Sequence, residues 1–237
     1  MPSSYFVDHI PVNTAHNRRP GLYLAPEYIT IHSTGNPSST ARNERAWLTN
    51  PVNNRTASWH TCVDEKEAIE AIPLNETAWH AGDGAGPGNR KSMAIEICES
   101  GDREKTLAHA AALVAGLLQA RDWDVGRLRR HFDWSGKACP RIFMDNNWAG
   151  WETFKGSVQT KLKARLKGGA EMYAANSPRP ALPQIQRRVE GTIDGRPADF
   201  EAYLIDNVTY VPLRPLVEDL KIRLEWKADK FHIHTAQ

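Results

Sequence analysis

A run of apolar residues interrupted by the carboxylate of Glu96 constrains the fold of this chain more than any other segment. The run, Ser92–Glu99, reads SMAIEICE. Apolar side chains at successive positions predict a strand that is buried on both faces of a sheet. The next segment, Arg103–Arg121, predicts an amphipathic helix, since its apolar residues recur at helical spacing. These residues are Leu107, Ala111, Val114 and Leu118. A buried strand followed directly by such a helix is typical of an α/β domain.

Other segments agree with this class. β-Branched and aromatic residues predict strands at Tyr28–Ser33, Ser58–Val63 and Ala68–Ile72. Helices are expected from Ser38 or Ser39 to Leu48 and from Trp148 to Lys167, with Gly168-Gly169 ending the second. A Gly-rich loop is expected over Ala81–Arg90. The sequence therefore predicts an α/β fold with a mixed central sheet flanked by helices.

The last quarter of the chain has a different pattern. Prolines and polar residues over 170–184 predict a linker between a larger domain, 1–169, and a small α+β domain, 185–237. In the small domain we expect a strand ending at the turn Asp194-Gly195, strands at Asp199–Ile205, Val208–Val211, Ile222–Trp226 and Lys230–Thr235, and a helix at Leu213–Leu220. So small a unit has little core of its own, so we expect it to form a homodimer or to dock on the larger domain.

Composition excludes several classes of protein. Lys and Arg number 30 and Asp and Glu number 28, so a net charge of +2 indicates no nucleic-acid partner. No apolar run is long enough to cross a bilayer, which argues against membrane insertion. The segment Met1–Arg19 lacks the apolar region of a secretory signal, so we expect accumulation in the cytoplasm. Three cysteines do not make a disulfide scaffold.

Two histidines and one cysteine form a candidate metal site. His32 lies where the first predicted strand ends, and open α/β sheets bind ligands at that edge. His131 and Cys139 are eight residues apart across a short loop. Two imidazoles and a thiolate suit Zn²⁺ and leave a fourth position for water. The alternative, that Cys139 is a small buried hydrophobic residue, stays open on spacing alone.

Glu96 and Lys137 are candidate catalytic residues. A carboxylate between two isoleucines in a buried strand is costly unless it has a partner. Close to a zinc-bound water, Glu96 could act as general base. Lys137 precedes Cys139 by two residues, so its cation could stabilise an oxyanion near the metal. The alternatives are a half-exposed strand for Glu96 and an exposed loop lysine for Lys137.

Two Trp-His pairs suggest a ligand groove. His60 follows Trp59 and His80 follows Trp79. Aromatic walls and imidazole donors would suit a sugar-peptide ligand. The alternative is that these residues pack at strand ends.

Five sequence motifs follow one another along the chain: YITIHSTG from Tyr28, ASWHTCVD from Ala57, PLNETAWHAG from Pro73, GNRKSMAIEIC from Gly88 and RHFDWSGKACP from Arg130. In this order they resemble the motifs of the type 2 N-acetylmuramoyl-L-alanine amidases, which share a fold with peptidoglycan recognition proteins. Within that family, the chain is similar to phage and prophage endolysins of spore-forming bacteria.

The resemblance implies one Zn²⁺ ion, held by His32, His131 and Cys139. It implies that Glu96 activates the attacking water and that Lys137 stabilises the oxyanion. The expected reaction is hydrolysis of the amide bond between N-acetylmuramic acid and L-alanine in bacterial peptidoglycan. Substrate-binding residues are expected at His60, Trp79, His80 and Asn89. Related proteins have a tyrosine near the position of His60, where this chain has none.

The C-terminal part is similar to the copper amine oxidase N-terminal-like module, through Gly195-Arg196, Thr209–Leu216 and Glu225-Trp226. This similarity does not imply copper binding. We expect residues 185–237 to bind the cell wall, because residues 1–169, the expected amidase domain, act on an insoluble substrate. The resemblance to endolysins implies accumulation in the host cytoplasm and release through a holin-type membrane lesion.

Three alternatives compete with a zinc amidase. The main one is a non-catalytic peptidoglycan-binding protein of the same fold, in which the thiolate ligand is lost. A zinc deaminase would need H-x-E together with C-x-x-C, which the sequence lacks. A purely structural zinc site would need a fourth ligand, for which Cys62 or Cys98 would have to be recruited.

Overall fold

The computed structural model describes the backbone of residues 4–176 and of six strands between residues 191 and 235, and the side chains of residues 4–167. The chain divides into two compact units, Met1–Glu171 and Met172–Gln237.

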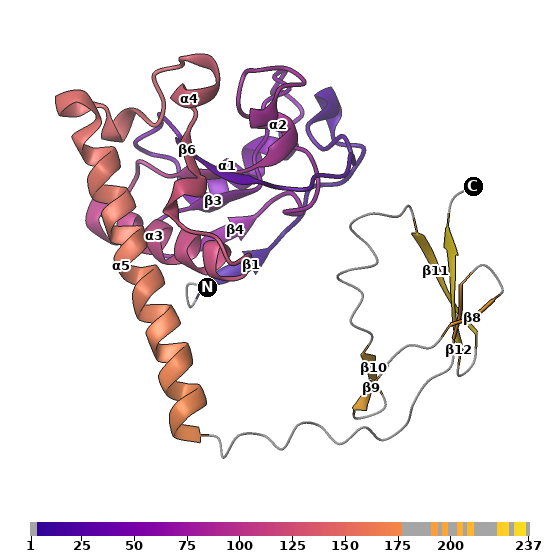
Figure 1. Ribbon diagram of the computed structural model, residues 1–237. Coiled ribbons are helices and arrows are strands. Elements are labelled where there is room, and N and C mark those ends of the chain that lie inside the picture. Colours follow the sequence, from indigo (N-terminus) through magenta and orange to yellow (C-terminus); the bar gives the residue numbers. More distant parts are fainter. Residues whose placement is uncertain are drawn as a thin grey trace. The chain divides into compact units, whose positions relative to one another are not determined.

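The first unit is built on one six-stranded sheet (Figure 1). Its strands are β1 (Tyr5–Val7), β2 (Tyr28–Ser33), β3 (Thr61–Val63), β4 (Ala68–Glu70), β5 (Ser92–Ile97) and β6 (Leu128–Arg130). They lie in the order β1-β4-β3-β5-β2-β6. The pair β3/β4 is antiparallel and the other neighbours are parallel, so the predicted mixed sheet is confirmed.

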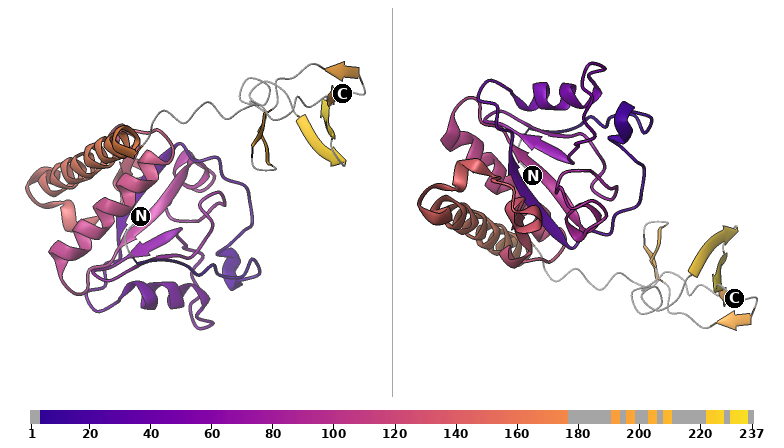
Figure 2. Two further views of the ribbon diagram at one scale, coloured as in Figure 1. Left: turned by 90° about the horizontal axis from the view of Figure 1, so that it is seen from below. Right: turned by 90° about the horizontal axis from the view of Figure 1, so that it is seen from above.

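Helices lie on both faces of the sheet (Figure 2). They are α1 (Ala41–Thr49), α2 (Pro87–Lys91), α3 (Arg103–Gln119), α4 (Phe132–Ser135) and α5 (Asp145–Asn176), with 3-10 turns at Ala15–Asn17, Val125–Arg127 and Arg141–Phe143. Buried residues of α3 and α5 share one core with one face of the sheet. Buried residues of α1 share a second core with the other face. The unit is thus a three-layer α/β domain.

The alternation of side chains along β2 and β5 places His32 and Glu96 on the same face of the sheet. Ile95 and Ile97 of β5 and Ile31 of β2 belong to the core beneath α3 and α5. Side chains alternate between the faces of a strand, so His32 and Glu96 lie on the opposite face, which is the face of α1. The register pairs His32 directly with Glu96. The sheet therefore places an imidazole and a carboxylate side by side at the carboxyl end of two neighbouring parallel strands.

Local hydrogen bonds define where α1 and α3 begin. The side chain of Thr40 accepts a hydrogen bond from the N–H of Asn43, and Asp64 accepts one from the N–H of Ala41. At α3, Asp102 accepts a hydrogen bond from the N–H of Lys105. Such caps satisfy N–H groups that the first turn of a helix leaves without partners.

The structure corrects several predicted boundaries. Helix α5 continues through Gly168-Gly169 to Asn176, so its last turns occupy the first residues of the predicted linker. Two glycines cost about 1 kcal/mol each in a helix, but the segment that follows, AEMYAAN, is rich in residues that favour helix. The predicted loop Ala81–Arg90 contains most of α2, which Pro87 begins. Strands β1 and β6 were not predicted, and β3 and β4 are shorter than predicted.

The second unit contains six described strands. They are β7 (Gly191–Ile193), β8 (Arg196–Ala198), β9 (Tyr203–Ile205), β10 (Val208–Tyr210), β11 (Ile222–Lys227) and β12 (Lys230–Thr235). They form a two-stranded sheet, β10-β9, and a four-stranded sheet, β11-β12-β7-β8. The strands β7 and β8 that flank the predicted turn are antiparallel. The predicted helix at 213–220 and most of the linker, 177–184, lie outside the described residues.

In the described part of the chain, no helix combines the length and the hydropathy of a membrane-spanning segment.

Candidate metal centre

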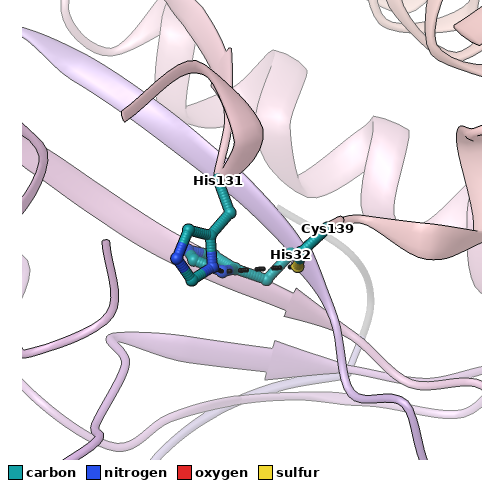
Figure 3. A group of neighbouring side chains, drawn as sticks. All are labelled: His32, His131 and Cys139. Atoms are coloured by element: carbon teal, nitrogen blue, oxygen red, sulfur yellow. Dashed lines mark hydrogen bonds between the residues drawn. The ribbon is translucent and has the colours of Figure 1, made fainter. Parts of the chain in front are cut away.

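Three side chains that are far apart in the sequence converge at the carboxyl end of β2 (Figure 3). They are His32, His131 and Cys139, all buried, and their ligand atoms lie within 4.8 Å of one another. Nδ1 of His32 lies 3.0 Å from Nδ1 of His131 and 3.8 Å from Sγ of Cys139. The structure thus brings together the three residues predicted as zinc ligands.

Backbone hydrogen bonds around β6 explain this convergence. Strand β6 pairs with β2, and the N–H of His131 donates to the carbonyl of Ile31 at 3.3 Å, which places His131 beside His32. The N–H of Phe132 then donates to the carbonyl of Cys139 at 3.0 Å and folds the loop back on itself. Gly136 ends α4 with a φ of 71°, a left-handed conformation that glycine adopts without strain.

Two of the three separations among the ligand atoms, those that involve His32, are close to the separations around one small ion. A tetrahedral Zn²⁺ ion has Zn–N distances of ~2.0–2.1 Å and a Zn–S distance of ~2.3 Å, which places its ligand atoms about 3.3–3.6 Å apart. The separations of 3.0 and 3.8 Å from Nδ1 of His32 bracket this range. The donor set, two imidazoles and one thiol, is one that Zn²⁺ prefers, and three protein ligands leave a fourth position free.

A chain of hydrogen bonds sets the tautomer of His32. Nε2 of His80 lies 3.4 Å from the carbonyl oxygen of Ser92, which only accepts, so this nitrogen carries a proton. Nδ1 of His80 is then the acceptor of the 3.0 Å hydrogen bond from Nε2 of His32. His32 is left with an unprotonated Nδ1 that faces His131 and Cys139. A metal-binding histidine commonly has its second nitrogen fixed in this way.

The electrostatics also fit a divalent cation. Burial lowers the pKa of His32 well below 6.5, and burial with the nearby Lys137 lowers the pKa of His131 to about 4, so both imidazoles are neutral and free to act as ligands. Burial and Glu96 raise the pKa of the Cys139 thiol to about 12. A cation is therefore needed to hold Cys139 as a thiolate at neutral pH.

Glu96 lies next to the three predicted metal ligands. One carboxylate oxygen, Oε1, lies 3.9 Å from Nδ1 of His32, and the other, Oε2, is buried without a hydrogen-bond partner. Burial raises the pKa of Glu96 to about 8, while Lys137 acts to lower it. An unpartnered buried carboxylate oxygen is costly, so a missing cation or substrate group is its natural partner.

A groove of about 1060 Å³ opens onto these residues. It runs from the three predicted ligands along α1 and the loop that follows it. The lining includes Glu96, Lys137, Trp79 and His80, and on the α1 side Asn43, Glu44, Trp47, Asn50, Asn53 and Arg55. Lys137 is exposed and lines this groove.

The predicted substrate-binding residues fall into two pairs. Trp79 and His80 line the groove. His60 is fully buried: its Nδ1 accepts from the N–H of Ala94 and its Nε2 donates to the carbonyl of Glu76, so backbone groups engage both nitrogens. Asn89 is buried as well, and its side-chain oxygen accepts from the N–H groups of His80 and Ala81. Asn89 thereby holds the backbone of His80.

Glu44 was not predicted as a site residue; it is a buried carboxylate that lines the groove together with Trp47. Burial raises its pKa. Its signal in the sequence is an acidic residue on the apolar face of α1, three residues after Ala41 and four before Leu48, which are both buried.

Comparisons with known proteins point to one family. A family model described as N-acetylmuramoyl-L-alanine amidase matches residues 22–142. The amidase XlyA of Bacillus subtilis (strain 168) is 42% identical over 155 residues, which cover 64% of this chain and 50% of XlyA. The amidase CwlA of the same organism is 45% identical over 150 residues, which cover 61% of this chain and 52% of CwlA. The chain therefore spans about half the length of these curated relatives.

Solved structures agree with the sequence comparison. The catalytic domain of XlyA, 41% identical, matches with a TM-score of 0.60 over 65% of this chain and 99% of that domain. The structure of PlyL, 32% identical, matches with a TM-score of 0.59 over 67% of this chain and 98% of that chain. The family model covers slightly more than half of the 237 residues. The chain thus belongs to the N-acetylmuramoyl-L-alanine amidase family.

Proposed function

We propose that the first unit hydrolyses the amide bond between N-acetylmuramic acid and L-alanine in bacterial peptidoglycan, with one Zn²⁺ ion bound by His32, His131 and Cys139. The observation that carries this proposal is the juxtaposition of three metal-type ligands with Glu96 at one end of an open groove. Membership of the amidase family and the likeness to endolysin structures support the choice of substrate.

Each residue has a role that follows from its position. When bound, Zn²⁺ would lower the pKa of a water molecule and polarise the scissile carbonyl. Oε2 of Glu96, which lacks a partner, accepts the proton of the attacking water and delivers it to the leaving nitrogen of L-alanine. The ammonium group of Lys137 stabilises the negative charge that develops on the carbonyl oxygen.

His80 supports the reaction without touching the scissile bond. Its hydrogen bond to His32 keeps Nδ1 of His32 unprotonated, and Asn89 fixes the backbone of His80. The walls of the groove, which include Trp79, bind the sugar and the stem peptide on either side of the amide.

The competing function is binding of peptidoglycan without hydrolysis. Cys139 argues against it, because its thiol completes the ligand set and lies buried next to His32. A binding protein would have no need for an unpartnered carboxylate beside three metal-type ligands.

A soluble muropeptide tests the proposal directly. The zinc-loaded protein is expected to release a stem peptide with a free N-terminal L-alanine, and Cys139→Ser is expected to lose both bound zinc and hydrolysis. A Cys139→Ser variant with full activity would overturn the assignment. Binding of the muropeptide without cleavage by the wild-type protein would favour the receptor.

The remaining proposals concern the second unit and the biological setting. We infer that residues 185–237 bind the cell wall, a proposal supported by their similarity to a module of cell-surface proteins and by the insolubility of the substrate. Release of the protein through a holin-type lesion and dimerisation through the second unit stay predictions.

A further inference from the structure

We propose that Glu99 and Arg141 form a clamp that holds the Cys139 loop against the ends of β2 and β5, so that both are positioning residues for the third zinc ligand. The inference deepens the proposed function, since it rests on Cys139 being a zinc ligand. Neither residue lies among the predicted catalytic or ligand residues, and neither lines the groove.

The carboxylate of Glu99 joins three segments. It follows Glu96 by three residues at the end of β5. Its Oε1 accepts a hydrogen bond of 2.9 Å from the N–H of Gly35, which follows His32 by three residues at the end of β2. The guanidinium of Arg141 donates to both carboxylate oxygens, from Nε at 2.9 Å and from Nη2 at 2.6 Å. One carboxylate therefore connects the segments that carry His32, Glu96 and Cys139.

Arg141 brings the loop to this point. It lies two residues after Cys139, and its own N–H donates to the side chain of Ser33, the residue after His32, at 3.1 Å. The backbone and the side chain of Arg141 thus bind β2 and Glu99 respectively. Together with the hydrogen bond from Phe132 to the carbonyl of Cys139, these contacts fix the loop that carries Cys139.

Burial makes the pair sensitive to the loss of either partner. The Glu99 side chain is only 6% exposed, although Arg141 is 51% exposed. A buried carboxylate that loses its cation is left with an uncompensated charge. The two-pronged geometry also requires the planar guanidinium, which a lysine ammonium does not reproduce.

The first test uses the metal-free full chain and needs neither zinc nor substrate. Cys62 and Cys98 are 0% exposed and Cys139 is 6% exposed, so a thiol reagent such as 5,5′-dithiobis(2-nitrobenzoate) reports on Cys139 in the folded protein. We expect Glu99→Gln and Arg141→Gln each to raise the rate of modification about tenfold or more. Glu76→Gln is the matched control, because Glu76 accepts two hydrogen bonds of 2.7 Å from Arg19 and neither residue contacts a ligand residue.

Removing a charge next to a thiol also changes its reactivity, but with opposite signs for the two variants. Loss of the Glu99 carboxylate lowers the pKa of Cys139 and loss of the Arg141 cation raises it. An increase in the modification rate with both variants therefore shows that the loop carrying Cys139 has lost its position. An increase with Glu99→Gln together with a decrease with Arg141→Gln would mean that only charge matters and would overturn the proposal.

The second test measures zinc affinity by competition with a chelator. We expect Glu99→Gln, Arg141→Gln and the charge-conserving Arg141→Lys to weaken zinc binding by about 10–100-fold, and Glu76→Gln to leave it unchanged. Thermal unfolding of each metal-free variant controls for a general loss of stability. If the clamp variants bind zinc as tightly as Glu76→Gln does, the clamp is refuted. If they bind zinc weakly but the wild-type protein cleaves no muropeptide, the clamp stands and the proposed function fails.

Discussion

Glu96 belongs both to a buried strand, β5, and to the candidate metal centre. Its neighbours Ile95 and Ile97 are buried in the core beneath α3, whereas its own carboxylate lies beside His32 with one oxygen unpartnered. Glu96→Gln keeps the shape of the side chain but removes the proton acceptor. We expect turnover of a soluble muropeptide to fall by about 10²–10⁴-fold, with zinc content and thermal stability close to those of the wild type. Unchanged turnover would exclude Glu96 as the base.

His60 has a structural role that predicts a pH dependence of stability. Both of its nitrogens bind backbone groups, and burial lowers its pKa from 6.5 to about 4. Between these two values the unfolded chain binds a proton that the folded chain does not. The contribution of His60 to the free energy of unfolding is therefore complete above about pH 6.5 and declines by roughly 3 kcal/mol as the pH falls to about 4.

Urea unfolding of the metal-free protein at a series of pH values measures this effect. The His60→Gln variant serves as the comparison, because the other histidines are common to both proteins. We expect the variant to lose stability less steeply than the wild type between about pH 6.5 and about pH 4. Equal slopes for the two proteins would show that His60 does not titrate differently on folding.

At this scale the sequence predicted the candidate ligands but not their supports. His32 was singled out by its place at the end of a predicted strand, and His131 and Cys139 by their spacing across a short loop; the family resemblance joined the three into one zinc site. The supporting contacts were not predictable: the hydrogen bond between His32 and His80 depends on the tertiary fold. The burial of His60, a predicted substrate-binding residue whose nitrogens bind backbone groups, also depends on the tertiary fold.

At the scale of elements, the short helix α2, which precedes β5, depends on close packing at Gly88. A Cβ atom at Gly88 would lie 2.4 Å from Cβ of Ala81 and 2.8 Å from Cγ of Trp134. Gly88→Ala is therefore expected to destabilise the domain by about 1–3 kcal/mol and to weaken zinc binding, because the neighbouring Asn89 holds the backbone of His80.

Gly156 provides the matched control for that substitution. It lies within α5, and an added Cβ would meet nothing within 4 Å. Gly156→Ala is expected to stabilise the protein by roughly 0.5–1 kcal/mol, since alanine favours helix more than glycine does. Thermal unfolding of the two variants should shift the midpoint in opposite directions. Equal shifts would mean that an added Cβ atom at Gly88 does not disturb the packing of α2.

A helix or strand could be predicted from the sequence when its own residues carry a complete hydrophobic pattern. Strands β2 and β5 and helix α3 carry complete hydrophobic patterns, and the structure confirms them within one or two residues. Strands β1 and β6 have three residues each, too few for a period to be detected, and they exist because β4 and β2 offer partners. Helix α5 was predicted to end too early, because the helix-ending effect of two glycines was overestimated relative to the helix-favouring residues that follow them.

At the scale of the whole molecule, the second unit is expected to hold the catalytic unit on an insoluble substrate. Tethering raises the effective concentration of the groove at the wall without altering the groove itself. Deletion of residues 185–237 should therefore reduce co-sedimentation with purified cell walls much more than it reduces hydrolysis of a soluble muropeptide. Co-sedimentation equal to that of the full chain would show that these residues are not the anchor.

The most direct test of the central claim is mass spectrometry of purified peptidoglycan after digestion by the zinc-loaded full chain. We expect stem peptides that begin with a free L-alanine amino group, together with glycan strands whose N-acetylmuramic acid residues keep an unsubstituted lactyl carboxylate. Glu96→Gln should leave the walls largely intact. New reducing sugar ends, cleaved peptide cross-links or undigested walls in the wild-type reaction would contradict the proposed amidase activity.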